Sequence, residues 1–278
     1  MKIAFLGGGN MASALIGGLV NKGFDKSAIS VIEMAPAARE RLAGRFGVRV
    51  STAPDAATQG AEVLVLAVKP QDMQSGLASM AGNVRGKLVI SIAAGITIDA
   101  LSRWLEGHRH IVRCMPNTPA LIGAGVTGLY APADVNETEK RNAETILRAV
   151  GEVVWVPEER LLDPVTAVSG SGPAYVFWFI EQLAASAVAL GIPEAEAKTL
   201  ALHTVLGAAK LAVSSQSSPS ELRQQVTSKG GTTEAALRVF EEERLAERLQ
   251  RAVKAASERA AELGVRLGQT QGSGRDKA

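Results

Sequence analysis

The stretch that decides the fold is KIAFLGGGNMA, residues 2–12. Its apolar part, Ile3 to Leu6, predicts a short buried strand, and Gly7-Gly8-Gly9-Asn10-Met11-Ala12 follows directly. These residues fit the pattern G-x-G-x-x-A between a strand and a helix start, the context that the dinucleotide-binding motif requires. Gly7 permits the tight turn, Gly9 lets the backbone approach a pyrophosphate, and the helix start at Asn10 and Met11 offers free N–H groups. The alternative is a glycine turn that only connects a strand to a helix.

The rest of the N-terminal half continues this alternation of β-rich runs and helical patterns, which is typical of a parallel sheet with crossover helices. We expect strands at Ile3–Leu6, Ile29–Ile32, Val48–Val50, Val63–Val68, Leu88–Ile92, His110–Met115 and Val153–Val156, with Val126–Tyr130 as a further candidate. We expect helices at Asn10–Asn21, Pro36–Phe46, Gln71–Met80, Ile98–Leu105 and Asn136–Val150, with Thr97 and Asn136 as N-caps. The prediction is an α/β domain with a doubly wound, Rossmann-like sheet over residues 1–157.

After Pro157 the pattern changes, because apolar residues recur every three to four positions as far as Leu263. The expected helices are Leu161–Val168, Ala174–Leu190, Pro193–Ser214, Ser220–Thr227 and Thr232–Leu263, the last one broken near Glu243. These predict an all-helical second domain over residues 158–266. The polar, glycine-rich residues 267–278 are expected to be a disordered tail.

Composition restricts the class of protein. The 278 residues include 46% apolar ones and carry a net charge of only +2, which does not favour nucleic acid or a membrane surface as partner. The apolar run from Pro173 to Leu190 is interrupted by polar residues before the roughly 20 residues that a bilayer needs. One cysteine and three histidines do not indicate a metal site. Because the first strand starts at Ile3, we expect no export signal and a cytoplasmic protein.

Further candidate contacts for a dinucleotide lie where predicted strands end, since open α/β sheets bind ligands at the carboxyl ends of their strands. Glu33, after the second strand, is placed to accept hydrogen bonds from ribose hydroxyls, which favours NAD over NADP. Arg39 and Arg41 on the following helix could instead meet a 2′-phosphate, so the preference stays open. The other candidates are Ala67, Val68, Lys69, Pro70, Ala93, Ala94, Gly95 and Asn117, the last one for the nicotinamide carboxamide.

A second glycine turn lies in the helical half, at Val226 to Glu234. Ser228, Gly230, Gly231, Thr232 and Thr233 combine glycines and hydroxyls just before a helix, so their N–H groups could bind a carboxylate. Thr232 or Thr233 could also serve simply as the N-cap.

From Lys2 to about Leu263, the sequence resembles the pyrroline-5-carboxylate reductases. The segments that carry the resemblance are Phe5–Met11, Ala67–Pro70, Met115–Pro119, Ser169–Tyr175 and Val226–Glu234. The resemblance implies an oxidoreductase that uses NADPH or NADH to reduce the C=N bond of 1-pyrroline-5-carboxylate to L-proline. The family suggests NADPH, whereas Glu33 favours NADH. It also implies that Ser228, Gly230, Gly231, Thr232 and Thr233 bind the substrate, that Thr233 is the hydrogen-bond donor or proton relay, and that the helical domain forms a homodimer with the active site between subunits.

Three alternatives remain at this stage. A β-hydroxyacid dehydrogenase needs a lysine acid on a central helix, and the helix after Ser169 carries no lysine before Lys198. Another cyclic imino acid is harder to exclude, because the turn would recognise a carboxylate and not a ring. A dinucleotide-sensing or scaffold protein without catalysis is the third.

Overall fold

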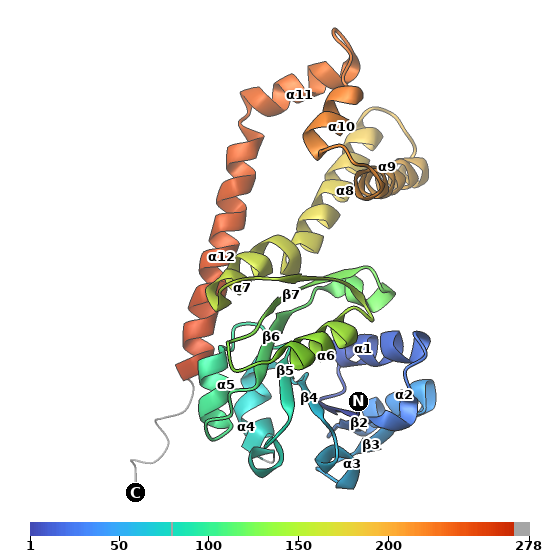
Figure 1. The fold of residues 1–278 in the computed structure, drawn as a ribbon. Coiled ribbons are helices and arrows are strands. Elements are labelled where there is room, and N and C mark those ends of the chain that lie inside the picture. The colour runs from blue at the N-terminus through green and yellow to red at the C-terminus, as the bar shows by residue number, and fades with distance from the viewer. Residues whose placement is uncertain (79, 270–278) are drawn as a thin grey trace, which may run out of the picture. The chain divides into compact units, whose positions relative to one another are not determined.

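The computed structural model describes residues 1–78 and 80–269 (Figure 1). Contacts divide the described residues into two compact units, of which the second is Gly172–Lys254 and the first is Met1–Ser171 together with residues 255–269. The domain boundary expected after residue 157 lies just after the last strand of the sheet. The compact unit defined by contacts extends further, to Ser171. The functional domain boundaries stay a prediction.

The first unit is built on one sheet of eight strands in the order β3-β2-β1-β4-β5-β6-β7-β8. The strands are β1 Ile3–Leu6, β2 Ile29–Ile32, β3 Arg49–Ser51, β4 Val63–Leu66, β5 Leu88–Ser91, β6 Ile111–Met115, β7 Gly125–Tyr130 and β8 Gly151–Trp155. All neighbours are parallel except β6 and β7. That pair is antiparallel because residues 116–124 are too few for the crossover that a parallel pair requires.

The register of the central strands determines which residues meet at the edge of the sheet. Leu6 of β1 pairs with Ile32 of β2 on one side and with Leu66 of β4 on the other. The residues that follow these strands, Gly7, Glu33 and Ala67, therefore leave the sheet at one place. Since the strand order reverses at β1, this place is the switch point where α/β sheets bind ligands.

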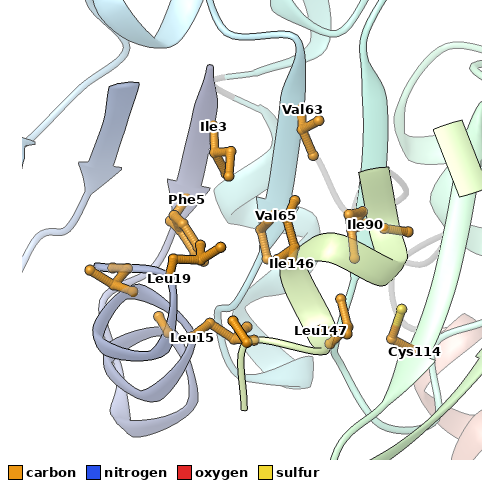
Figure 2. Close-up of a cluster of buried hydrophobic side chains, with 14 of the residues drawn as sticks. Ile3, Phe5, Leu15, Leu19, Val63, Val65, Ile90, Cys114, Ile146 and Leu147 are labelled. Carbon is orange, nitrogen blue, oxygen red and sulfur yellow. The ribbon is translucent and has the colours of Figure 1, made fainter. Parts of the chain in front are cut away.

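Helices cover both faces of the sheet (Figure 1). They are α1 Asn10–Asn21, α2 Pro36–Phe46, α3 Ala56–Gln59, α4 Met73–Ala78, α5 Ile98–Trp104 and α6 Glu137–Leu147. Alternate residues of β1 point to opposite faces, so Ile3 and Phe5 pack with α1 and α6, as Figure 2 shows. Ala4 and Leu6 pack in the other layer, with α4 and α5. The predicted caps are confirmed, since Thr97 accepts from Ala100 N and Asn136 forms a capping box.

The remaining helices are α7 Leu162–Val165, α8 Gly172–Ala189, α9 Glu194–Ser214, α10 Pro219–Gln225, α11 Thr232–Glu242 and α12 Leu245–Gln269. A wide helical turn, Thr166–Gly170, precedes α8. The predicted break near Glu243 is confirmed, because α11 ends there and Arg244 has a positive φ. The expected end at Leu263 and the disordered tail from 267 are wrong for residues 264–269, which continue α12 because Leu267 packs on the core of the first unit. The rest of that tail, 270–278, lies outside the described residues.

The second unit, Gly172–Lys254, buries few side chains of its own. No residue of α8 is buried, and α9 buries only Ala197 and Ala201. Exposed apolar side chains on these two helices are Val176, Phe177, Trp178, Phe179, Val188, Leu200, Leu202, Leu206, Leu211 and Val213. None of the helices over residues 1–78 and 80–269 is long and apolar enough to span a membrane.

Candidate active site

A cavity of about 820 Å³ lies at the switch point, at the carboxyl ends of β1, β2, β3 and β4. The glycine turn forms one wall of it, together with Glu33 and the chain after β4. The residues that line it are Leu6, Gly7, Gly8, Gly9, Ile32, Glu33, Met34, Ala35, Thr52, Ala53, Pro54, Ala67, Val68, Lys69, Asp72, Ser75 and Gly76.

The geometry of Gly7 shows why a glycine must stand there. Its φ is +97°, a conformation that costs other residues strain, and its N–H donates to the carbonyl of Ile32 at 2.8 Å. A Cβ on Gly7 would lie 2.8 Å from the backbone carbonyl of Ala67. The turn is therefore packed directly against the end of β4, as the motif requires.

Gly9 differs from Gly7, because a Cβ there would meet nothing within 4 Å. Packing inside the protein thus does not explain this glycine, and the motif reserves the position for the close approach of a ligand. It is also the N-cap of α1, and no side chain caps that helix. The first N–H groups of α1, at Asn10 and Met11, have no partner within the helix and are suited to bind phosphate oxygens. The turn therefore fits a dinucleotide.

Glu33 is tied to the same turn through its carboxylate. Oε2 accepts the N–H of Gly8 at 2.7 Å, and Oε1 accepts the N–H of Ala35 at 2.7 Å. Both oxygens keep further lone pairs for ribose hydroxyls. The negative charge therefore stands at a fixed position on the cavity wall.

Two arginines of α2 bind backbone carbonyls of the turn and of the end of β2. Arg39 Nη1 donates to the carbonyls of Glu33 at 3.0 Å and Met34 at 2.6 Å, and Arg41 Nη2 donates to that of Gly8 at 3.3 Å. Neither arginine lines the cavity. Their contacts stabilise the turn and the end of β2.

Only some of the residues that the sequence predicts as contacts after β4 lie on the cavity wall. Ala67, Val68 and Lys69 line the cavity, whereas Pro70 starts a short helix, Pro70–Asp72, beside it. The sequence reasoning missed Thr52–Pro54 and the pair Asp72 and Ser75, which also line it. The rule that ligands bind at strand ends could have found Thr52, because β3 ends at Ser51.

Ala93, Ala94, Gly95 and Asn117 do not line this cavity. Asn117 is 8% exposed, and both ends of its amide are engaged, Nδ2 with the carbonyl of Ser169 at 3.1 Å and Oδ1 with the N–H of Val126 at 2.9 Å. In this arrangement it fastens the wide turn before α8 to β7. Its contact with a carboxamide stays a prediction.

The second glycine turn, Ser228 to Thr233, forms the start of α11 in the second unit. Gly231 is the N-cap, so neither threonine has that role, and no side chain caps the helix. The N–H of Gly230 donates to Glu234 Oε2 at 2.7 Å, and that of Gly231 donates to the carbonyl of Ser228 at 3.0 Å. The donors left for a ligand are the first N–H groups of α11, at Thr232 and Thr233, and the hydroxyls.

Comparison with known proteins finds family matches for both the sheet-containing part of the chain and the helical part. Residues 2–95 match a family described as NADP oxidoreductase, coenzyme F420-dependent, and residues 159–263 match the pyrroline-5-carboxylate reductase dimerisation family. The pyrroline-5-carboxylate reductase of Pseudomonas aeruginosa is 44% identical over 269 residues, 96% of this chain and 98% of that protein. The chain belongs to the pyrroline-5-carboxylate reductase family.

Solved structures of pyrroline-5-carboxylate reductases have the same fold. That of Coxiella burnetii superposes with a TM-score of 0.91 at 41% identity, covering 94% of this chain and 98% of that one. That of Plasmodium falciparum, which has NADP bound, gives 0.81 at 30% identity and covers 95% and 98%. The predicted architecture, a Rossmann-like α/β domain followed by a helical domain, is thereby confirmed.

The match of 159–263 to the reductases' dimerisation family explains the exposed apolar side chains of the second unit. Phe177 and Trp178 on α8 are 65% and 59% exposed. Apolar surface of this extent favours association with another chain. Self-association is thus what both the family match and the surface indicate.

Proposed function

We propose that this protein uses NAD(P)H to reduce the C=N bond of 1-pyrroline-5-carboxylate and so produces L-proline, the last step of proline biosynthesis. The observation that carries this proposal is the glycine turn at the switch-point cavity, in a chain of the pyrroline-5-carboxylate reductase family. A cytoplasmic location stays a prediction of the sequence.

The bound reduced dinucleotide would supply a hydride to the carbon of the C=N bond, while the ring nitrogen ends with a proton. A protonated imine is already electrophilic, so the main task of the protein is to orient the two reactants. Gly7, Gly9, Asn10 and Met11 would hold the pyrophosphate, and Glu33 the adenosine ribose. Ala67–Pro70, Ala93–Gly95 and Asn117 are proposed for the nicotinamide half.

The proposed site for the substrate carboxylate is the turn from Ser228 to Thr233. The N–H groups of Thr232 and Thr233 and the Ser228 hydroxyl would bind the carboxylate, and Gly230 and Gly231 shape the turn. The hydroxyl of Thr233 would donate to the ring nitrogen or relay its proton. In the proposed homodimer, this turn of one subunit faces the dinucleotide of its partner.

The cofactor is proposed to be NADH in preference to NADPH. The Glu33 carboxylate is held on the cavity wall by two N–H groups, so it would repel a 2′-phosphate, and Arg39 and Arg41 are bound to carbonyls. A like-charge contact worth about 1.4 kcal/mol changes a ratio of affinities about tenfold. We expect Glu33→Gln to shift the ratio of kcat/KM for NADH over NADPH about tenfold towards NADPH.

The matched control for this variant is Glu40→Gln, which removes the same charge from an exposed residue of α2 outside the cavity. The two ratios are obtained by following the absorbance of each reduced dinucleotide at fixed substrate. An unchanged ratio in Glu33→Gln, or the same shift in both variants, would contradict the role of Glu33.

The reaction itself is tested by mixing the purified protein with 1-pyrroline-5-carboxylate and following the oxidation of NADH and NADPH in separate assays. Formation of L-proline, identified by mass spectrometry, is the expected result. If neither dinucleotide is consumed, the reductase proposal is wrong. Consumption with a six-membered cyclic imino acid alone would assign a different substrate.

The role of Thr233 is tested by Thr233→Ala, which removes the hydroxyl and keeps the backbone N–H. We expect kcat to fall by about 10²-fold, within the usual range for a positioned proton donor, with an unchanged Kd for the dinucleotide. Thr232→Ala, the neighbouring change at the same helix start, should lower kcat much less. Equal turnover in the wild type and Thr233→Ala would remove Thr233 from the mechanism.

A further inference from the structure

The loop after β5, residues 92–97, contacts the C-terminal part of α12 through two glycines, Gly95 and Gly264, which both belong to the first unit. A Cβ on Gly264 would lie 3.1 Å from the carbonyl oxygen of Gly95. A Cβ on Gly95 would lie 3.5 Å from the N of Gly264 and 3.2 Å from Leu267 Cδ1. The backbone of the helix therefore rests directly on the backbone of the loop. A side chain at either position would push the two apart.

This contact continues along the helix towards α5. Leu267 packs against the buried cluster that includes Ala93 and Ile96. One turn of α12 after Gly264, Arg103 Nη2 donates to the carbonyl of Gly268 at 3.3 Å. The end of α12 is thus fixed on the same elements that carry the loop.

The other end of the loop is held as well. Thr97 caps α5, and the N–H of Ile98 donates to Glu159 Oε1 at 2.8 Å. Within the loop Ala93 and Ile96 are buried, Gly95 has a φ of +79°, and Ala94 is exposed. The loop therefore has one conformation that packing imposes from both sides, and it presents Ala94 at the carboxyl end of β5.

We propose that Gly264, near the end of α12, is a positioning residue for the dinucleotide through its backbone contact with Gly95. By supporting the carbonyl of Gly95, it fixes the loop that would lie against the nicotinamide. This rests on the proposed function, which assigns Ala93–Gly95 to the nicotinamide half of the cofactor. The residues that line the cavity at Gly7 and Glu33, proposed for the pyrophosphate and the adenosine ribose, include none from α12.

The test compares Gly264→Val with Gly268→Val, where a Cβ meets only Ala100 Cβ, at 3.8 Å. Both variants introduce the same residue on the same helix. Calorimetric titration gives the Kd of NADH and that of ADP-ribose, which lacks the nicotinamide. We expect the Kd of NADH to rise about tenfold in Gly264→Val only, with that of ADP-ribose within about twofold of the wild type.

Hydrogen exchange of residues 93–97 supplies a second readout that needs no activity, and it should be faster in Gly264→Val than in Gly268→Val. If Gly264→Val does not bind ADP-ribose because it does not fold, Gly264→Ala takes its place and should show a smaller rise in the same direction. Equal changes for NADH and ADP-ribose, no change for NADH, or an equal effect of Gly268→Val would overturn the proposal. If the wild type itself does not bind NADH, the proposed dinucleotide site is wrong, and the role of Gly264 with it. This outcome differs from all those above, in which the wild type binds NADH and only the variants differ.

Discussion

At the scale of single residues, Gly7 and Gly9 have different reasons to be glycine, and the difference can be measured. Gly7→Ala puts a methyl group 2.8 Å from the Ala67 backbone at a positive φ, so we expect it to lower the free energy of unfolding by about 1–3 kcal/mol. Gly9→Ala adds its methyl group in open space and should leave that free energy nearly unchanged while weakening dinucleotide binding. Urea unfolding and NADH titration of both variants provide the two quantities.

Each of the two variants has a result that would contradict its expectation. If Gly9→Ala binds NADH as the wild type does, the close approach of a pyrophosphate to this glycine is wrong. If Gly7→Ala is as stable as the wild type, the turn relaxes more easily than its contact with β4 indicates.

Cys114 gives a second prediction at this scale. It is 1% exposed on β6, and burial raises the pKa of its thiol, so almost no thiolate is present near neutral pH. We expect no reaction with a thiol reagent in the folded protein and one modified residue after unfolding in urea, as counted by mass spectrometry. Rapid modification of the native protein would show that β6 opens locally.

The sequence is informative about these residues to different degrees. The glycine turn and Glu33 were predictable, because a motif and a strand end place them. The hydrogen bond from the N–H of Gly8 to the carboxylate of Glu33 was not predictable, since it depends on the register of β1 and β2 and on the rotamer of the Glu33 side chain. Asn117 shows the same limit, because its partners Ser169 and Val126 come from distant segments that the local pattern does not reveal.

At the scale of elements, a charged cluster ties β6 to the helices that follow the sheet. The side chain of Arg113 is 6% exposed, with Nη1 2.9 Å from Glu159 Oε1 and Nη2 3.9 Å from Asp163 Oδ1. Burial raises the pKa of Asp163 above its ordinary value of 3.8, Arg113 lowers it, and Glu159 raises it. Asp163 is therefore a carboxyl whose ionised form the fold disfavours.

This shift determines how stability depends on pH. A raised folded-state pKa contributes stability that is complete below the unfolded pKa and is lost as pH rises through the folded pKa. The wild type should therefore lose stability relative to Asp163→Asn as pH rises from the acid range to neutral. Urea unfolding of both proteins at several pH values measures this difference, and a constant difference would contradict it.

Asp55 provides a control of opposite sign. It caps α3, and the backbone N–H of Thr58 lowers its pKa, with Arg49 adding to the effect against the penalty of burial. Its stabilising contribution is present above the unfolded pKa and is lost as pH falls through the folded pKa. The wild type should therefore gain stability relative to Asp55→Asn over the same rise in pH.

Most elements were predictable because their periodicity is local. Strand β1 and helices α1 and α2 have the expected bounds. Helix α3 was missed, because its capping box has Thr58 where the usual sequence signature has Glu or Gln. The end of α12 was placed too early, because its last turn is polar in composition and is stabilised by Leu267 against the first unit. Tertiary packing determined that boundary, and composition could not show it.

At the scale of the whole molecule, the apolar surface of α8 and α9 predicts an obligatory oligomer. We expect Trp178→Glu to dissociate it, because a buried unpaired carboxylate at an interface costs several kcal/mol. Sedimentation velocity measures the assembly. Val154→Glu is the matched control, since Val154 is 53% exposed on β8, outside the region that matches the dimerisation family. Dissociation by the control alone would place the interface elsewhere.

Subunit mixing tests whether the active site is shared between two chains. Gly9→Ala and Thr233→Ala should each be nearly inactive when the dinucleotide concentration is far below the Kd of Gly9→Ala, the first because it binds the dinucleotide weakly and the second because it lacks its donor. A mixed dimer with shared sites has one site with both defects and one with neither. Random reassociation makes about half of the dimers mixed, so about a quarter of wild-type activity should return.

If each site were built within a single chain, every subunit of the mixed dimers would keep its own defect. No activity would then return, and the shared site would be wrong. Trp178→Glu introduced into both variants should abolish the recovery even if the site is shared, because the mixed dimers can no longer form. Recovery of activity that survives this substitution would show that the two half-sites meet through a surface other than α8. The experiment therefore tests the position of the subunit interface independently of the role of Thr233.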